Sequence, residues 1–407
     1  MNAPSSSSLP LDGVRVVVTR TRQQSAALIS ALEKLGAEAV SVPVIEITDP
    51  ADGGAALRDG LAALQAGDWV VISSPNGAGR VVEALEGRSL NQGVSVAVIG
   101  PGTKARAEAA GLTVDLMPSA SIAEGLLEFL PGPGAGGGTM LLARAQEARA
   151  LLPDGLRRRG WTVNDVAAYR TVGLPVAEAD FAACRHADVA AFTSASTVRH
   201  LFDGVGRENL PPVLACIGPA TADQAEALDL SPDIVSTEHS IPGLVGAIAA
   251  AIPQMVLLRP EPAEAADSQW LLEQYYAEID RRFATGLDRS AVLTSDPEEV
   301  SPPNGLFLAG RLAGRPVACG ALKGVEPGVA DIKRMWVSDR VRGRGVGRRL
   351  LRRLVAEARA DGLHRVRLET NEGLTEAISL YRSEGFVEVT AFNNEPHAHH
   401  WFSLDLG

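Results

Sequence analysis

The sequence predicts an α/β protein in two unlike parts: two similar lobes built on parallel sheets, then a smaller domain whose elements come in a different order. In residues 13–252, short β-branched runs alternate with helical stretches rich in Ala and Leu, which is the pattern of parallel strands joined by helices. Two blocks of sequence within this half repeat each other. A chain of 407 residues is long enough for two or three compact units.

The strand-like runs of the first half follow one another with helical stretches between them. The repeat pairs VVISSPNGA with VAAFTSAST, and AVIGPGTKARAEAAGL with ACIGPATADQAEALDL. A duplicated block of this length predicts two similar lobes with a small-molecule site between them. We expect strands at residues 14–19, 39–47, 69–73, 94–99, 140–143, 188–193 and 213–217.

Composition shifts mark the boundaries of the two parts. Residues 1–10 are predicted to be a disordered tail, because they hold a run of serines and none of the features of a signal peptide. The Pro- and Glu-rich stretch RPEPAEAA predicts a linker at residues 256–267, between a first part at 11–255 and a second at 268–407. The linker composition predicts only modest coupling between the parts.

Charge and cysteine usage exclude several classes of function. The net charge of −11 argues against a protein that coats nucleic acid. The three cysteines are far apart and form no CxxC pair, so neither a disulfide framework nor a zinc site is expected. No apolar run approaches the roughly 20 residues that span a bilayer. We therefore expect a cytoplasmic protein without a membrane or metal partner, and a monomer is the expected form.

A Gly-rich turn in the second part has the character of an anion site. The sequence RGRGVG at residues 342–347 stands between a predicted strand and an Arg-rich helix, and helix N-terminal amides in such a turn favour a pyrophosphate. It lacks the lysine of a P-loop and the acidic residue of a dinucleotide site. A tight turn without a ligand is the alternative. The helix arginines Arg348, Arg349, Arg352 and Arg353 form either a solvated face or phosphate partners.

From about residue 268 to residue 406 the chain resembles the GCN5-related N-acetyltransferase (GNAT) family. Its R-x-x-G-x-G motif is met by Arg342, Gly345 and Gly347, with KRMWV before it and LETNEGLTEAISLYRSEGF after it. The resemblance implies an α+β domain with a mixed sheet that uses acetyl-CoA as acetyl donor. It implies donor contacts from strand backbone, turn amides and one asparagine: Met335, Val337, Arg342, Gly343, Arg344, Gly345, Val346, Gly347, Arg348 and Asn371.

The same resemblance implies the groups that move protons. Tyr381 matches the tyrosine that protonates the leaving CoA thiolate, and a phenol with an ordinary pKa of about 10 is a suitable donor to a thiol of about 8.5; a core aromatic is the alternative. Asp331 stands where relatives often carry a Glu base, and would act through a water. The predicted first helix, with Tyr275, Tyr276 and Arg282, is expected near an amine acceptor.

A metal site at the histidines of HAHH, residues 397–400, is disfavoured.

Hydroxyl groups recur at the strand ends of the first half. Ser74 and Ser194 end strands, and Thr103 and Thr221 follow a Gly-Pro turn that opens a helix. Strand ends line crevices in parallel sheets, and hydroxyls with helix amides can bind carboxylates there. The alternative is that these residues only cap helices, and capping is expected to be part of the role of both threonines.

Residues 13–252 resemble uroporphyrinogen-III synthases. The likeness rests on VVVTRTRQQSAAL, ISSPNGA, AVIGPGT, LLARAQEAR, AAYRT, AFTSAST, CIGPATADQAEALDL and SIPGLVGAI, all in register. It implies a bilobal fold in which the first strand joins the C-terminal lobe, so that one lobe comprises about 11–44 plus 172–255 and the other 45–171. It also implies a cofactor-free cyclisation of hydroxymethylbilane, with Tyr169 as candidate proton donor; a hinge residue whose hydroxyl is already hydrogen-bonded is the alternative. The expected contacts to the acetate and propionate arms are Arg20, Ser74, Thr103, Arg144, Ser194 and Thr221.

The leading hypothesis is a bifunctional enzyme that acts on hydroxymethylbilane and on an unidentified amine. A first alternative is a tetrapyrrole- or anion-sensing module that regulates an acetyltransferase without turnover. A second alternative makes the C-terminal domain a degenerate CoA-binding scaffold, against which the intact Gly turn and Tyr381 count.

Overall fold

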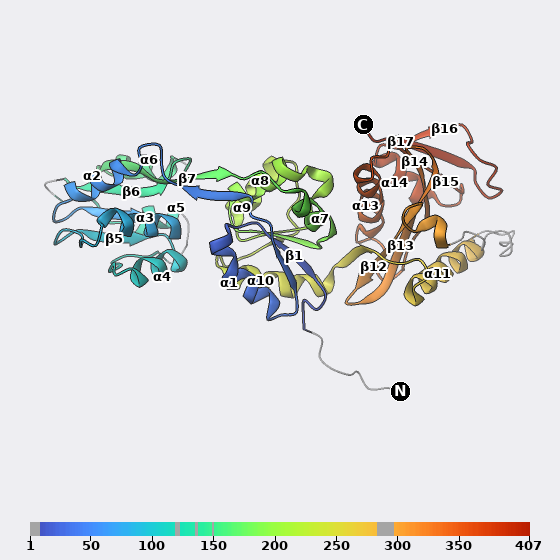
Figure 1. The fold of residues 1–407 in the computed structure, drawn as a ribbon, viewed down its shortest axis with the longest axis horizontal. Helices are drawn as coiled ribbons and strands as arrows, with labels where there is room; N and C mark the ends of the chain where they lie inside the picture. The colour runs from blue at the N-terminus through green and yellow to red at the C-terminus, as the bar shows by residue number, and fades with distance from the viewer. Residues whose placement is uncertain (1–8, 119–122, 135–136, 149, 283–296) are drawn as a thin grey trace.

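The computed structural model describes residues 9–118, 123–134, 137–148, 150–282 and 297–407. The tail expected at residues 1–10 lies almost wholly outside them. Three sheets, each flanked by helices, follow one another along the long axis of the molecule (Figure 1). None of the helices in the described ranges is both long and apolar enough to cross a bilayer.

The first sheet is fully parallel and has the order β10-β9-β8-β1-β2. Val16 and Val18 pack into the core on one face of β1, and Val17 packs into the core on the other, so the strand is buried on both sides as a central parallel strand must be. The strands are β1 (Arg15–Val18), β2 (Glu38–Ser41), β8 (Val189–Phe192), β9 (Val213–Cys216) and β10 (Ile234–Val235). The helices are α1 (Arg22–Glu33), α7 (Glu178–His186), α8 (Ala195–Val205), α9 (Pro219–Ala227) and α10 (Ile241–Ala251).

The second sheet has the order β3-β7-β6-β4-β5. All its neighbours are parallel except the edge pair β3 and β7, which is antiparallel. The strands are β3 (Ile45–Thr48), β4 (Trp69–Ile72), β5 (Ser95–Val98), β6 (Thr139–Ala145) and β7 (Thr162–Gly173). The helices are α2 (Ala55–Ala63), α3 (Pro75–Leu85), α4 (Pro101–Ala109), α5 (Ala123–Phe129) and α6 (Leu151–Arg158).

Strands β3 and β7 connect the lobes, and the sequence patterns predicted neither of them correctly. The run expected as one strand at 39–47 is two strands in different sheets, β2 and β3, because Pro43 interrupts the ladder between them. The long strand β7 was not expected at all. It lies antiparallel to β3, and these two strands cross from one lobe to the other (Figure 1).

The third sheet is mixed, with the order β11-β12-β13-β14-β15-β17-β16. The linker expected at 256–267 is wrong in its first half: the apolar residues there form edge strand β11, which pairs antiparallel with β12. The strands are β11 (Val256–Pro260), β12 (Gly305–Leu312), β13 (Arg315–Glu326), β14 (Val329–Val337), β15 (Arg365–Thr370), β16 (Val387–Val389) and β17 (His400–Asp405). The helices are α11 (Ala266–Arg282), α13 (Val346–Ala360) and α14 (Thr375–Ser383).

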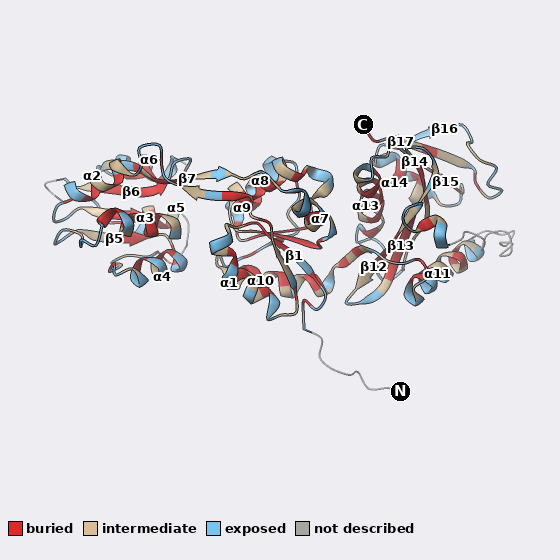
Figure 2. Ribbon diagram, in the orientation of Figure 1, coloured by how far each residue is buried: buried red, intermediate tan, exposed pale blue. Residues whose placement is uncertain are grey.

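Each of the three sheets has its own buried core. In each sheet the central strands are buried, while the outer helix faces are exposed (Figure 2). Short 3₁₀ turns complete the described elements at Arg207–Asn209, Ile252–Gln254 and Pro297–Val300.

Two candidate active sites

A divergence of two parallel strands opens the site in the third sheet. β14 pairs with β15 only from Val329 to Asp331. Beyond that point β14 continues to Val337 against β13 alone, and β15 continues to Thr370 against β17. Within the described part of the chain, the backbone groups on the free side of β14 therefore have no strand partner and need another one.

A cavity of about 1340 Å³ lies at this divergence, next to α11 and the first turn of α13. Aromatic side chains and charged side chains of both signs line it. Ten of the residues expected to contact the donor or protonate its thiolate are among those lining it: Met335, Val337, Arg342, Gly343, Gly345, Val346, Gly347, Arg348, Asn371 and Tyr381. Tyr275, Tyr276 and Arg282 line it as well, whereas Arg344 and Asp331 do not.

The Gly-rich turn has the backbone that its glycines permit. Gly343 has φ of 75° and Gly345 has φ of 72°, a left-handed region in which a side chain is strained. Gly345 precedes the first residue of α13, and none of the side chains that the structure describes caps that helix. The first amides of α13 therefore remain available to an anion in the cavity.

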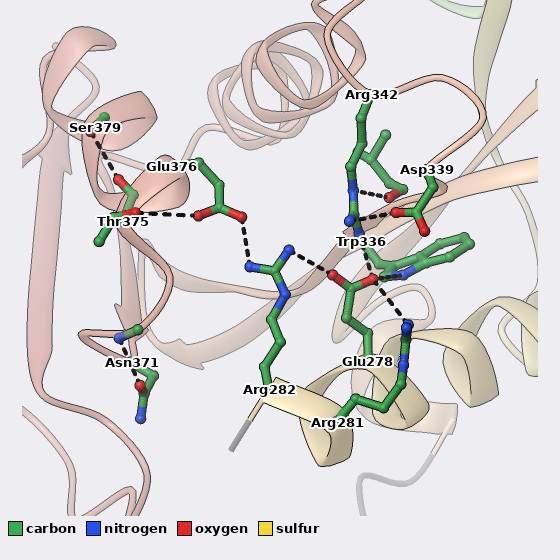
Figure 3. Close-up of polar contacts among 12 residues, drawn as sticks. Glu278, Arg281, Arg282, Trp336, Asp339, Arg342, Asn371, Thr375, Glu376 and Ser379 are labelled. Carbon is green, nitrogen blue, oxygen red and sulfur yellow. Dashed lines mark hydrogen bonds and ion pairs between the residues drawn. The ribbon is translucent and has the colours of Figure 1, made fainter. Parts of the chain in front are cut away.

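The side chain of Arg342 is bound to the protein itself. Its Nε donates to the carbonyl oxygen of Val337 at 2.9 Å, and Nη1 lies 2.5 Å from Asp339. Its Nη2 donates to Glu278. Figure 3 shows Arg282 reaching between Glu278 and Glu376 beside this group. The motif arginine thus stabilises the turn, which leaves the turn amides to meet a ligand.

Tyr381 is buried against aromatic residues at one side of the cavity. Its ring lies 6.0 Å from that of Phe386 and 5.9 Å from that of Phe402. Burial, with a smaller effect from the charge of Glu369, raises the pKa of Tyr381 to about 12. The phenol therefore keeps its proton at neutral pH, as a general acid must. Asn371, just beyond β15, donates to the carbonyl oxygen of His397 at 2.8 Å.

The carboxylate at the cavity is not the expected one. Asp331 accepts from Arg367 Nε at 2.9 Å, outside the cavity lining, and burial raises its pKa. Glu369 on β15 does line the cavity, is close enough to raise the pKa of Tyr381, and is paired with Lys333. Sequence reasoning missed Glu369, which stands in the quoted segment LETNEG but was not singled out.

The candidate proton donor of the first part contacts one of the predicted hydroxyls. The hydroxyls of Tyr169, on β7, and Ser74, before α3, lie 2.9 Å apart. Burial raises the pKa of Tyr169, although hydrogen bonds with Ser74 and Asn76 oppose it. Ser74 also accepts from Gly77 N at 3.0 Å as the cap of α3. Capping and contact with Tyr169 are therefore combined in one residue.

A hydrogen-bond chain reaches from this tyrosine to the other lobe. Arg20 donates to Gln24 at 3.4 Å, and Gln24, on α1 of the first sheet, donates to Asn76 on α3 of the second. Burial lowers the pKa of Arg20. Gln24 and Asn76 both stand in quoted motifs, yet no local signal marked them, because their contact joins segments far apart in the chain.

The other predicted residues of this part are held within their own lobes. Thr103 and Thr221 are buried inside the first turn of α4 and α9, whose caps are Gly100 and Gly218, so the expectation that the threonines cap these helices is wrong. Ser194 caps α8 and lies 3.0 Å from Ser196 Oγ. The guanidinium of Arg144 forms a two-point ion pair with Asp165, at 2.6 and 2.5 Å.

The histidines near the end of the chain have acidic neighbours. His400 Nδ1 lies 2.6 Å from Glu388, and His399 Nδ1 lies 3.9 Å from Glu372. Across the described ranges, no group of three or more His, Cys, Asp or Glu side chains is arranged to hold a metal ion.

Comparison with known proteins divides the chain into the same two parts as the fold does. The sequence profile described as uroporphyrinogen-III synthase HemD matches residues 26–246, more than half of the chain. The chain belongs to the uroporphyrinogen-III synthase family. The profile of the acetyltransferase (GNAT) family matches residues 268–386. The chain therefore joins a domain of the uroporphyrinogen-III synthase family to a GNAT acetyltransferase domain, and both are enzyme families.

Individual relatives cover one part each. A uroporphyrinogen-III synthase of Synechococcus elongatus is 29% identical over 59% of this chain and 96% of its own length. A putative uroporphyrinogen-III synthase of Methanothermobacter thermautotrophicus is 30% identical over 59% of this chain and 100% of its own. An IAA acetyltransferase of Azospirillum brasilense is 34% identical over 35% of this chain and 90% of its own. The synthase–acetyltransferase fusion thus resembles two complete enzymes joined in tandem.

Proposed function

We propose that this chain is a bifunctional enzyme. Its residues 11–255 close hydroxymethylbilane into uroporphyrinogen III with inversion of ring D, and residues 268–407 transfer an acetyl group from acetyl-CoA to an amine. The family matches support each half separately. For the synthase we propose one lobe at 11–44 plus 172–255 and one at 45–171, which the membership of the first two sheets supports.

The contact between Tyr169 and Ser74 carries the synthase proposal. Cyclisation begins when the terminal hydroxyl of hydroxymethylbilane leaves as water, which needs a proton. Tyr169 is 7% exposed and has a raised pKa, so its phenol is protonated at neutral pH. Its hydroxyl would donate to the leaving group while Ser74 orients it. Because the remaining steps mainly require the chain to be held in a cyclising shape, Arg20, at the lobe contact, is suited to hold a carboxylate arm.

The divergence of β14 and β15 carries the acetyltransferase proposal. Acetyl-CoA supplies an activated acetyl thioester, and the residues present fit it. The unpaired edge of β14 near Met335 and Val337 suits the amides of the pantetheine arm, and the turn from Gly343 to Gly347 suits the pyrophosphate. When the amine attacks the thioester carbonyl, its nitrogen would lose a proton to Glu369, which lines the cavity; as the carbon–sulfur bond breaks, Tyr381 would give its own proton to the leaving thiolate.

The first experiment supplies the purified chain with enzymatically generated hydroxymethylbilane and identifies the isomer formed. We expect isomer III. If a folded sample gives only isomer I, which forms without catalysis, the synthase assignment fails and a sensing role for the lobes replaces it. A parallel assay follows CoA release from acetyl-CoA across a panel of small amines, and absence of release with every amine would contradict the acetyltransferase half.

A further inference from the structure

Glu278, on α11, is a buried carboxylate that binds side chains from two other segments and from its own helix. The indole Nε1 of Trp336, on β14, donates to it at 2.9 Å, and Arg342, in the Gly-rich turn, donates to the same oxygen. Arg282, one turn further along α11, contacts its other oxygen at 2.9 Å. The residue is only 9% exposed, so an unpaired charge there would be costly. Figure 3 shows these donors gathered around one side chain.

Glu278 binds Arg342, which is the first residue of the 342–347 turn. Because the guanidinium of Arg342 is also bound to Val337 and Asp339, its orientation is set by three protein oxygens. Val337 belongs to β14, so Arg342 links the turn to the free-edged strand as well as to α11. A charge-assisted contact of this kind is the strong class of hydrogen bond. These contacts fix the turn beside the cavity, whose lining includes Gly343 and Gly345.

We propose that Glu278 is a positioning residue for acetyl-CoA binding: through Arg342 and Trp336 it fixes the conformation in which the 342–347 turn meets the donor pyrophosphate. The inference rests on the proposed use of acetyl-CoA. It assigns to α11, the helix expected to face the acceptor, a second role in donor binding. Arg282 extends the same connection to Glu376 on α14, at 2.6 Å, across the cavity.

Calorimetric titration of the full chain with acetyl-CoA tests the proposal. We expect Glu278→Gln and Arg342→Gln each to weaken binding about tenfold. Because both act through one contact, the double variant should bind no more weakly than either single variant. Glu273→Gln, an exposed carboxylate on the same helix outside the cavity lining, is the matched control and should bind like the wild type.

The outcomes separate this inference from the proposed function. If the wild type binds acetyl-CoA and Glu278→Gln binds equally well, Glu278 has no positioning role and the proposed function stands. Losses that multiply in the double variant overturn the link through Arg342. If Glu278→Gln does not fold, the more exposed Arg342→Gln tests the same contact from its other end, and unchanged affinity there overturns the proposal. A wild type that does not bind overturns both.

Discussion

Tyr169 is the residue whose hydroxyl the synthase proposal depends on. Replacing it with Phe removes the proton donor while leaving a ring of the same shape in a buried site, so folding should be preserved. We expect Tyr169→Phe to slow formation of isomer III about 10²-fold. The measurement is the initial rate of isomer III from enzymatically generated hydroxymethylbilane. Tyr381→Phe, in the other domain, is the control and should form isomer III at the wild-type rate. If the rate of Tyr169→Phe is within threefold of the rate of this control, Tyr169 is not the proton donor.

Tyr381 should determine turnover in the acetyltransferase without determining donor affinity. We expect Tyr381→Phe to lower kcat about 10²-fold while the KM for acetyl-CoA stays nearly constant. Since the pKa of Tyr381 is raised to about 12, the acid form persists as the pH rises, and deprotonation of this group should cost no activity between pH about 7 and about 10. A fall in kcat near pH 9 that disappears in Tyr381→Phe would contradict the raised pKa.

The two carboxylates near the acetyltransferase cavity allow a direct comparison. Glu369 lines the cavity, whereas Asp331 is held by Arg367 outside it. We expect Glu369→Gln to lower kcat about 10²-fold, the low side of the usual range for proton-transfer groups. Asp331→Asn should instead act mainly on folding, because it breaks a buried ion pair. Steady-state kinetics and thermal melting of both variants distinguish them, and the reverse pattern would restore Asp331 as base.

The turn that precedes α13 shows how an element depends on single backbone positions. Gly345 has φ of 72°, and a methyl group there would meet no atom of the described residues within 4 Å, so we expect the penalty to come from the backbone. We expect Gly345→Ala to lower the free energy of unfolding by about 1 to 2 kcal/mol. Gly347 lies within α13, where a methyl group would make ordinary contacts at 3.8 Å. Gly347→Ala is therefore the control, expected within about 0.5 kcal/mol of wild type in denaturant unfolding. Equal losses would contradict a backbone origin.

At the scale of elements, the sequence predicted most strands of the first two sheets because each is a short apolar run between helices. It could not predict β7, since TVNDVAAYRTVG mixes polar and apolar residues and pairs with two different neighbours. Nor could it show that Val256–Pro260 belongs to the third sheet, because edge pairing with β12 is a long-range choice. The same reason hid Glu278 and the contact of Gln24 with Asn76, whose partners come from distant segments.

At the scale of the whole molecule, two buried carboxylates, one from each part, form ion pairs between the synthase part and the third sheet's domain. Glu357, on α13 and 2% exposed, accepts from Arg185 on α7 of the synthase at 2.9 and 2.6 Å. Asp188, also 2% exposed and just before β8, accepts from Arg259 on β11 at 2.8 and 2.6 Å. α13 lies beside α7 of the middle lobe in Figure 1. These contacts show that the two parts touch, and the modest coupling that the linker composition predicts stays a prediction.

The arginines of α13 do not form a uniform solvated face. Arg353 is mostly buried, and its Nη2 donates to the carbonyl oxygen of Arg185 at 2.7 Å. Arg348 and Arg352 instead pair with Glu384 at 2.9 and 2.6 Å. The first turn of α13 therefore borders the cavity between β14 and β15. The later turns of the same helix bind the synthase lobe.

Removing Arg185 tests whether this contact joins the two parts energetically. Arg185→Ala leaves the buried Glu357 with Arg353 as its remaining arginine, and the loss of charge-assisted hydrogen bonds should cost about 1 to 3 kcal/mol. Because the loss falls at the interface, we expect the thermal unfolding of the acetyltransferase to separate from that of the synthase and to move to lower temperature. Arg157→Ala, which removes an exposed ion pair within the second lobe, should change stability by less than about 1 kcal/mol. If calorimetry gives the same profile for both variants, the domains are tethered rather than docked, because a docked pair cannot lose its central ion pair without losing stability.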